Sequence, residues 1–176
     1  MKERANTNPH IRSFVLKQNK NFPNSKFPVL IYRKAIVLPE QKNKAANIAQ
    51  KLFIRNGWSN SWRNGIYDFH HYHSNTHECM AICMGSANII LGGSNGKRIK
   101  LKKGDVIILP AGVGHRCTAK TSDFLCVGSY PEGKDYDINT GTSEEYKKAT
   151  KQLSKIPVPK HDPVFGKEGF LKAYWK

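Results

Sequence analysis

The sequence HHYHSNTHE occupies residues 70–78 and is the stretch on which the interpretation of the fold depends. Side chains of a β-strand alternate between its two faces, so His71 and His73 would point to one side. His70 would point to the other side and is expected to be structural. Two imidazoles on one strand face are typical of a metal-binding pair, and Glu78 supplies a carboxylate nearby. We therefore expect this stretch to lie at a metal site.

Short apolar segments separated by turn residues surround this stretch, from Ile66 to Tyr130. Their number and near-regular spacing are typical of an all-β sandwich or barrel. The expected strands are Ile66 to His73, His77 to Met84, Ala87 to Leu91, Lys97 to Leu101, Asp105 to Leu109, His115 to Ala119 and Phe124 to Tyr130. Upstream, β-branched and aromatic residues predict a further strand from Phe27 to Leu38. The segment from Ile11 to Lys17 is expected to be a strand-like arm.

Two segments have the pattern of helices. Between Glu40 and Asn56, apolar residues recur with the spacing of an amphipathic helix, and Gly57 follows as a stop signal. A second helix is expected from Ser143 to Leu153, where Thr142 and Glu145 have the spacing of a capping box. We expect both helices to pack on the outside of the barrel.

Two other segments lack a regular pattern. The stretch from Trp58 to Gly65 is polar and ends in an Asn-Gly turn signal, so we expect a loop. Its two tryptophans either cover one end of the barrel or fill its core. Prolines in the C-terminal tail exclude a continuous helix there. The tail ends with aromatic residues, which indicates that it folds back onto the barrel or onto a second subunit.

Length and composition indicate a single folded domain. The 176 residues are 39% hydrophobic and 10% aromatic, and single cores commonly occupy roughly 100 to 200 residues. We expect a barrel core at about residues 27–130, with an N-terminal arm and a C-terminal helix and tail packed on it. No early segment approaches the roughly 18 apolar residues of a membrane span. Because Met1 to Lys20 also lacks the apolar core of a signal peptide, we expect a cytoplasmic protein.

The formal net charge of +16 raises nucleic acid as a partner. The excess lysines are scattered, however, and the dense block from Lys97 to Lys103 alternates basic and apolar residues. We expect an edge strand with a solvated basic face there, rather than a nucleic-acid site. The four cysteines show no CxxC spacing and fall in expected strands, which indicates reduced thiols.

The spacing around the histidines resembles the motifs of the cupin superfamily. The intervals of its first motif are matched by Gly65, His71, His73, Glu78 and Gly85. Those of the second are matched by Gly104, Pro110, Gly112 and His115, with Ala119 in place of the usual Asn. More narrowly, HHYHSNTHE and GDVIILPAGVGH are similar to one-domain bacterial cupins of unassigned role. The resemblance implies a double-stranded β-helix, or jelly-roll barrel, with one or two peripheral helices and a divalent metal near its axis.

We expect His71, His73, Glu78 and His115 to bind one divalent ion. Glu78 starts the return strand, and His115 follows a Pro-Gly turn in another hairpin. His77 would face away in a regular strand, but a bulge would bring it in, so it remains an alternative ligand. Three nitrogens and one oxygen suit Fe, Mn, Ni, Zn or Cu, and the Irving-Williams order leaves the choice among them open.

Alternation along the strands predicts the residues that surround the ion: Tyr67, Phe69, Met80, Ile82 and Cys117. None of them supplies a second acid or a lysine that could act as a general base. We expect a metal-dependent enzyme that acts on a small molecule in an oxygenase-like or isomerase-like reaction. The alternative is a non-catalytic cupin that binds or senses a small ligand. The resemblance also implies a homodimer.

Overall fold

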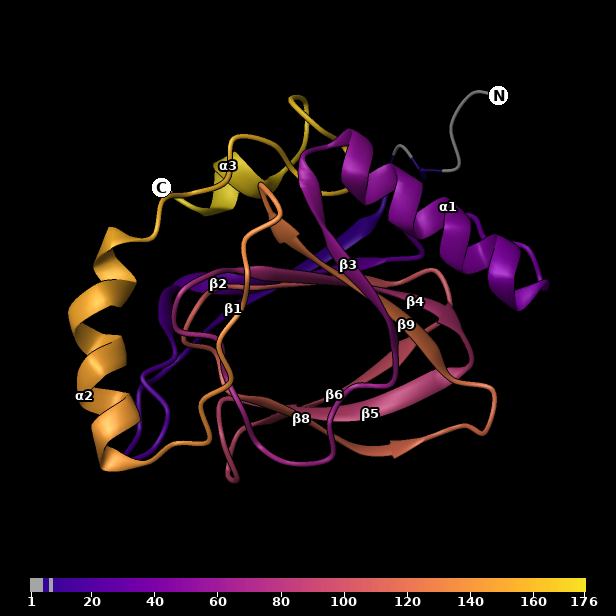
Figure 1. Ribbon diagram of the computed structural model, residues 1–176. Coiled ribbons are helices and arrows are strands. Elements are labelled where there is room, and N and C mark those ends of the chain that lie inside the picture. The colour runs from indigo at the N-terminus through magenta and orange to yellow at the C-terminus, as the bar shows by residue number, and fades with distance from the viewer. Residues whose placement is uncertain (1–4, 7) are drawn as a thin grey trace.

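Two antiparallel β-sheets form the body of the protein (Figure 1). The computed structural model describes residues 5, 6 and 8–176. The strands are β1 (His10–Leu16), β2 (Ser25–Arg33), β3 (Trp58–Asn64), β4 (Glu78–Met84), β5 (Ser86–Leu91), β6 (Lys97–Lys102), β7 (Val106–Leu109), β8 (His115–Lys120) and β9 (Leu125–Pro131). The helices are α1 (Lys42–Arg55), α2 (Ser143–Gln152), a 3-10 turn (Leu153–Lys155) and α3 (Leu171–Tyr174). The larger sheet has the order β1-β2-β7-β4-β9-β3 and the smaller β6-β5-β8, which gives the predicted jelly-roll barrel with helices outside it.

The core lies between the two sheets. Ile31 of β2 and Ile107 of β7 pack from the larger sheet against Ile89 of β5 and Leu101 of β6 from the smaller one. These residues alternate along their strands with residues that face away from the core, as the period of a strand requires. The smaller sheet has no helix over its other face in Figure 1.

The outer face of the larger sheet is buried as well. Ala81 of β4 and Val127 of β9 face outward and belong to one apolar cluster with Ala49 and Phe53 of α1, which lies against β3, β4 and β9. Leu30 of β2 and Ile108 of β7 belong to the same cluster. Because both faces of these strands are covered, their sequences are apolar almost throughout. The helix from Lys42 to Arg55 thus has the peripheral position that its amphipathic pattern predicts.

Most predicted strands and both predicted helices are confirmed to within a few residues. The capping box of α2 is present: Thr142 Oγ1 accepts a hydrogen bond from the Glu145 N–H at 3.3 Å. Strand β6 lies at an edge of the smaller sheet and alternates exposed basic side chains with buried Ile99 and Leu101. All four cysteines are buried and free. No helix in the described part of the chain has the length and apolar character needed to cross a membrane.

The loop predicted from Trp58 to Gly65 is wrong, because the segment contains β3, which pairs with β9. Its serine and asparagine residues carry no strand signal of their own, so the strand depends on pairing with its neighbour. The register shifts between Ser59 and Trp62, and Asn60 has a positive φ of 53°. This irregularity places Trp58 in the outer core beneath α1 and turns Trp62 toward the barrel interior.

The strand predicted from Ile66 to His73 is also wrong. His71 forms an isolated bridge with His115, and Tyr72 forms one with Asn139. Because successive residues pair with different segments, no continuous ladder forms. The interior of the barrel is therefore bordered here by an extended loop rather than by a strand.

The strand predicted from Phe27 to Leu38 ends early, at Arg33. Lys34 has a positive φ of 49°, and its backbone N–H donates a hydrogen bond to Oδ1 of buried Asp105 at 3.0 Å. Arg33 donates to the other carboxylate oxygen of Asp105. The Asp105 carboxylate thus binds the chain at Arg33 and Lys34, where it leaves the sheet.

The C-terminal tail folds back onto the outer face of the larger sheet. Trp175 stacks on Phe27 with ring centroids 5.3 Å apart. Earlier in the tail, the buried carboxylate of Asp162 accepts hydrogen bonds from the Tyr32 hydroxyl at 2.7 Å and from the Leu171 N–H at 3.2 Å. Asp162 therefore attaches the tail to β2.

Replacing Asp162 by Ala should loosen the tail. The change removes the acceptor of the Tyr32 hydroxyl and of several backbone N–H groups in the tail. Each buried donor left unpaired costs about 1–3 kcal/mol, so we expect the free energy of unfolding to fall by at least about 2 kcal/mol. Urea denaturation measures this loss. Glu168→Ala, which removes an exposed carboxylate of the same tail, is the control, and an equal loss in both variants would contradict the role of Asp162.

Glu145 holds the loop that precedes α2. Its Oε2 accepts hydrogen bonds from the backbone N–H groups of Thr140, Gly141 and Thr142, each at 2.9 Å. Burial raises the pKa of Glu145, but these hydrogen bonds outweigh burial and hold the pKa below the usual 4.5. The stability contributed by the charged form is present above that usual value and is lost as the pH falls through the lowered one.

Glu145→Gln should accordingly be less stable than the wild type at pH 7, and the difference should shrink as the pH falls below 4.5. Urea midpoints of both proteins across this pH range give the comparison. Glu144→Gln changes the neighbouring exposed carboxylate and serves as the matched control. A difference that stays the same at every pH would show that the charge of Glu145 is not the cause.

Candidate metal centre

Segments far apart in the sequence bring the four predicted ligands together. His71 and His73 lie between β3 and β4, Glu78 begins β4 and His115 begins β8. The His71 N–H donates to the His115 carbonyl at 3.1 Å, and the His115 N–H donates to the His71 carbonyl at 2.8 Å. The Gly112 N–H donates to the His73 carbonyl at 2.8 Å. These bonds join the two histidine-bearing segments along their backbones.

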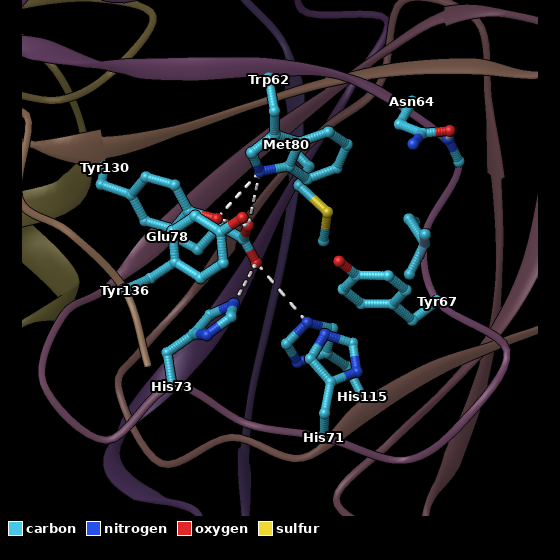
Figure 2. A pocket seen from close by; sticks show the side chains of 12 residues that line it. Trp62, Asn64, Tyr67, His71, His73, Glu78, Met80, His115, Tyr130 and Tyr136 are labelled. Carbon is cyan, nitrogen blue, oxygen red and sulfur yellow. Dashed lines mark hydrogen bonds and ion pairs between the residues drawn. The ribbon is translucent and has the colours of Figure 1, made fainter. Parts of the chain in front are cut away.

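The four side chains converge at one buried point (Figure 2). One ring nitrogen from each of His71, His73 and His115 lies within 4.8 Å of the other two. Oε2 of Glu78 is 3.4 Å from Nε2 of His73 and 3.5 Å from Nε2 of His115. An ion with ligand distances of about 2.0–2.2 Å holds neighbouring donors roughly 3 to 3.5 Å apart. The two separations from Oε2 of Glu78 fit such an ion.

Each of the three histidines presents the same ring nitrogen to this point. Nδ1 of His71 donates to the Phe69 carbonyl at 3.1 Å, and Nδ1 of His115 donates to the Val113 carbonyl at 3.0 Å. Nδ1 of His73 donates to the Asp137 carbonyl. A proton on Nδ1 leaves the lone pair on Nε2, which is the arrangement of a metal-binding histidine whose other nitrogen is held by a carbonyl.

The two carboxylate oxygens of Glu78 have different surroundings. Oε1 accepts hydrogen bonds from the Tyr130 hydroxyl at 2.8 Å and from Nε1 of Trp62 at 3.3 Å. Oε2 is buried and has no hydrogen-bond partner within the described residues. A buried polar atom without a partner is costly. A cation between Oε2 and the histidine nitrogens would satisfy it, so the residues present fit a divalent ion.

Trp62 reaches Glu78 because it lies against a glycine. A Cβ atom at Gly128 of β9 would stand 2.1 Å from the Trp62 ring. The missing side chain lets the indole lie over β9, where its Nε1 also donates to the Tyr130 hydroxyl at 2.9 Å. Trp62 and Tyr130 together fix the orientation of the carboxylate.

Burial and charge set the protonation of the cluster. Burial, followed by the nearby His115, lowers the pKa of His71 to about 3, so its imidazole is neutral near pH 7 and available as a ligand. Burial also lowers the pKa of His73, but the Glu78 carboxylate outweighs it and raises that pKa above the usual 6.5. Burial likewise opposes ionisation of Glu78, yet His73 and His115 hold its pKa well below the usual range. Glu78 is thus a charged carboxylate.

A second layer of contacts holds His73 from outside the barrel. The Asp137 carboxylate accepts a hydrogen bond from the Ser74 N–H at 2.6 Å. Gln152 of α2 donates through Nε2 to the Ser74 carbonyl at 3.1 Å. The loop before α2 and the end of α2 therefore position the segment that carries His73.

The cluster lines a cavity of about 130 Å³ (Figure 2). Of the predicted pocket residues, Tyr67 and Met80 lie in its wall. Phe69 stands outside it, 41% exposed and stacked on Tyr67. Ile82 lies further along β4 in the core between the sheets, and Cys117 lines a neighbouring depression. Alternation holds only within regular strands, and the segment that carries Phe69 is not one.

The structure places the other two histidines of the 70–78 stretch away from the cluster. His77 accepts a hydrogen bond from the Ala111 N–H through Nδ1 at 2.9 Å, and its Nε2 donates to the Pro157 carbonyl at 3.3 Å. Both of its ring nitrogens are therefore occupied. His70 lies against the ring of Phe22, with centroids 5.6 Å apart.

Trp62, Tyr130 and Tyr136 also line the cavity, and no sequence pattern identifies them as site residues. Trp62 falls in the segment for which the sequence predicts a loop. Tyr130 ends a predicted strand, but only the pairing of β9 with β4 brings it beside Glu78. Tyr136 lies in a polar loop without periodicity, so no sequence signal places it.

Comparisons with known proteins identify the family that the chain resembles. The Cupin domain family matches residues 64–128, which include all four predicted ligands. The chain is 39% identical to the uncharacterized protein YjlB of Bacillus subtilis (strain 168) over 149 residues, which is 85% of this chain and 86% of that protein.

Solved structures overlap with parts of the chain. The WlaRB TDP-quinovose 3,4-ketoisomerase of Campylobacter jejuni aligns with a TM-score of 0.42 and 15% identity, covering 51% of this chain and 75% of that one. The acireductone dioxygenase of Bacillus anthracis aligns with a TM-score of 0.38 and 15% identity, covering 53% and 62%. Family membership rests on the sequence matches, which span the barrel and its motifs. The chain belongs to the cupin family.

Proposed function

We propose that the protein binds one divalent ion through His71, His73, His115 and Glu78 and acts with it on a small molecule. The observation that carries the proposal is the buried Oε2 of Glu78, which accepts no hydrogen bond from the described residues and lies 3.4 Å from Nε2 of His73 and 3.5 Å from Nε2 of His115. Such a set of donors suits Fe, Mn, Ni, Zn or Cu. A bound ion would supply a Lewis-acidic centre with positions open to a small molecule.

The residues of the cavity wall limit what the chain itself contributes. Apart from the four proposed ligands, its titratable lining residues are Tyr67, Tyr130 and Tyr136. Burial, with the Glu78 carboxylate as the next cause, raises the pKa of Tyr130 far above its usual value. Tyr130 therefore keeps its proton near pH 7, donates it to Glu78 in a hydrogen bond and cannot serve as a base. An isomerase-like reaction by proton transfer would therefore need Tyr67, Tyr136 or one of the proposed ligands as its base, whereas an oxygenase-like reaction does not require one.

The second candidate is a cupin that binds or senses a small ligand without converting it. Among the described lining residues, the lack of a second acid or of a lysine supports it. Oxygen uptake on addition of a compound that binds the metal-loaded protein separates the two candidates. Binding without turnover under air favours the non-catalytic function.

Four further features belong to the same proposal. We infer a single cupin domain over residues 1–176, assembled as a homodimer in the cytoplasm. We also infer that nucleic acid is not its partner, because the exposed lysines of β6 belong to the solvated face of an edge strand. Light scattering gives the mass of the assembly, and a monomer contradicts the homodimer.

Substitution of the proposed ligands should abolish metal binding. We expect about one divalent ion per chain in the wild-type protein and a loss of at least tenfold in metal content in His71→Ala, His115→Ala and Glu78→Gln, since removal of even outer-shell partners costs about 10–100-fold in affinity. Elemental analysis of the purified proteins measures the content. A chelator should lower the Tm of the wild type and leave these variants unchanged.

His77→Asn is the matched control for this series, because His77 belongs to the same stretch but has both ring nitrogens occupied elsewhere. It should retain the ion. Metal content that persists in His71→Ala and His115→Ala but disappears in His77→Asn would place the ion at a different site.

A further inference from the structure

Exposed aromatic side chains gather at the mouth of the cavity. Tyr67 is 45% exposed, Phe69 41% and Tyr136 36%. We call these three residues the aromatic mouth. They come from two segments, one between β3 and β4 and the other after β9. Exposed aromatic rings that lie beside a cavity are suited to contact with a bound ligand.

The aromatic mouth continues directly from the proposed metal ligands. Tyr67 and Phe69 stack with ring centroids 4.9 Å apart, and the ring of Tyr67 is 5.1 Å from that of His71. On the other side, the ring of Tyr136 is 5.1 Å from that of His73. Figure 2 shows Tyr67 and Tyr136 on opposite sides of the cavity with the histidines between them. Tyr67 and Tyr136 therefore border the cavity beside the proposed ligands.

Among the described residues that line the cavity there is neither lysine nor arginine. Lys120 lies beside Gly65, with its Nζ 2.8 Å from where a Cβ of Gly65 would stand, and it lines a neighbouring depression rather than this cavity. The polar groups that the wall offers besides the cluster are neutral, namely tyrosine hydroxyls and the Asn64 amide. A carboxylate or phosphate on the outer part of a ligand would therefore lose water without gaining an ionic partner.

The cavity is too small to enclose a whole drug-sized ligand. Pockets that enclose a whole drug-sized ligand measure about 300–1,000 Å³, whereas this cavity measures about 130 Å³. It has room for a small head group only. The remainder of a larger ligand must lie at the mouth, in contact with aromatic rings.

We propose that the aromatic mouth binds the planar, uncharged ring of a small ligand whose oxygen-bearing head group reaches the histidine cluster. Tyr67 and Tyr136 both line the cavity and stand exposed, so their surface faces the space that the head group enters. That continuity favours a single molecule that fills cavity and mouth over a second copy of the chain lying across the opening. The inference rests on the proposed function, because the head group is held by the bound ion.

A pair of hydroxamic acids tests this inference by binding alone. Acetohydroxamic and benzohydroxamic acid share one metal-binding head group, and the second replaces a methyl group by a phenyl ring. With the zinc-loaded protein, we expect benzohydroxamic acid to bind about tenfold more tightly, and 4-carboxybenzohydroxamic acid to lose most of that gain. Titration calorimetry gives each Kd. Equal affinities for the first two, or tighter binding of the carboxylated compound, would overturn the inference.

Variants test whether the aromatic mouth causes the tighter binding of benzohydroxamic acid. Tyr67→Leu and Tyr136→Leu should each reduce the benzohydroxamate preference by about threefold to tenfold, the range of a single aromatic contact. Tyr67→Phe keeps the ring and should keep the preference. Tyr174→Leu removes a tyrosine that is 38% exposed in α3 and should change nothing. A preference that survives in Tyr67→Leu and Tyr136→Leu would overturn the inference.

Two further measurements separate the possible outcomes. Light scattering tests whether the aromatic mouth is a subunit contact, and binding of uncharged amides tests the aromatic mouth if the protein binds no metal. If light scattering shows that Tyr67→Leu or Tyr136→Leu dissociates an assembly, the aromatic mouth is a subunit contact and the inference fails. If the protein takes up no metal, the proposed function fails, and benzamide is compared with acetamide, because neither needs an ion. A benzamide preference that Tyr67→Leu and Tyr136→Leu remove would then still support the aromatic mouth, and its absence would overturn it.

Discussion

The carboxylate of Glu78 is buried, and its two oxygens differ in their hydrogen bonding. One oxygen accepts hydrogen bonds from Tyr130 and Trp62, and the other has no partner among the described residues and faces two imidazoles. Leaving a charged oxygen buried and unpaired is costly, so the surrounding structure must compensate for it or provide a place for a cation. Much of the architecture around the cavity can be understood from this one group.

The barrel supplies each part of the environment of Glu78 from a different segment. Pairing of β4 with β9 brings Tyr130 beside the carboxylate, and the irregular register of β3, together with Gly128, turns Trp62 toward it. Backbone carbonyls hold Nδ1 of all three imidazoles, and Nε2 of His73 and of His115 faces the carboxylate. The loop before α2 holds His73 in place from outside. An irregular extended segment, rather than a strand, can present His71 and His73 while its backbone bonds two different neighbours.

The sequence predicts most of the strands, and its motif spacing selects four residues whose side chains lie near one another in the fold. It does not predict which other residues line the cavity beside them. Alternation and glycine turns mark β4 to β9, and the motif spacing selects His71, His73, Glu78 and His115 without knowledge of the sheet order. Trp62 and Tyr130 reach the site through strand pairings between distant segments, which no local pattern encodes. The positive φ of Asn60 further hides β3, because it interrupts the alternation on which strand prediction depends. The prediction that Phe69 lines the pocket fails for the same reason, since alternation does not hold once the strand is irregular.

The most direct measurement is the position of a bound ion in crystals of the metal-loaded protein, located by anomalous X-ray scattering at the absorption edge of the metal. A divalent ion at Glu78 should appear bonded to Oε2 of that residue and to Nε2 of His71, His73 and His115, with Tyr130 and Trp62 still donating to Oε1. An ion bound elsewhere, for example beside His77, or crystals in which the four side chains keep these positions and bind no metal, would contradict the proposed centre.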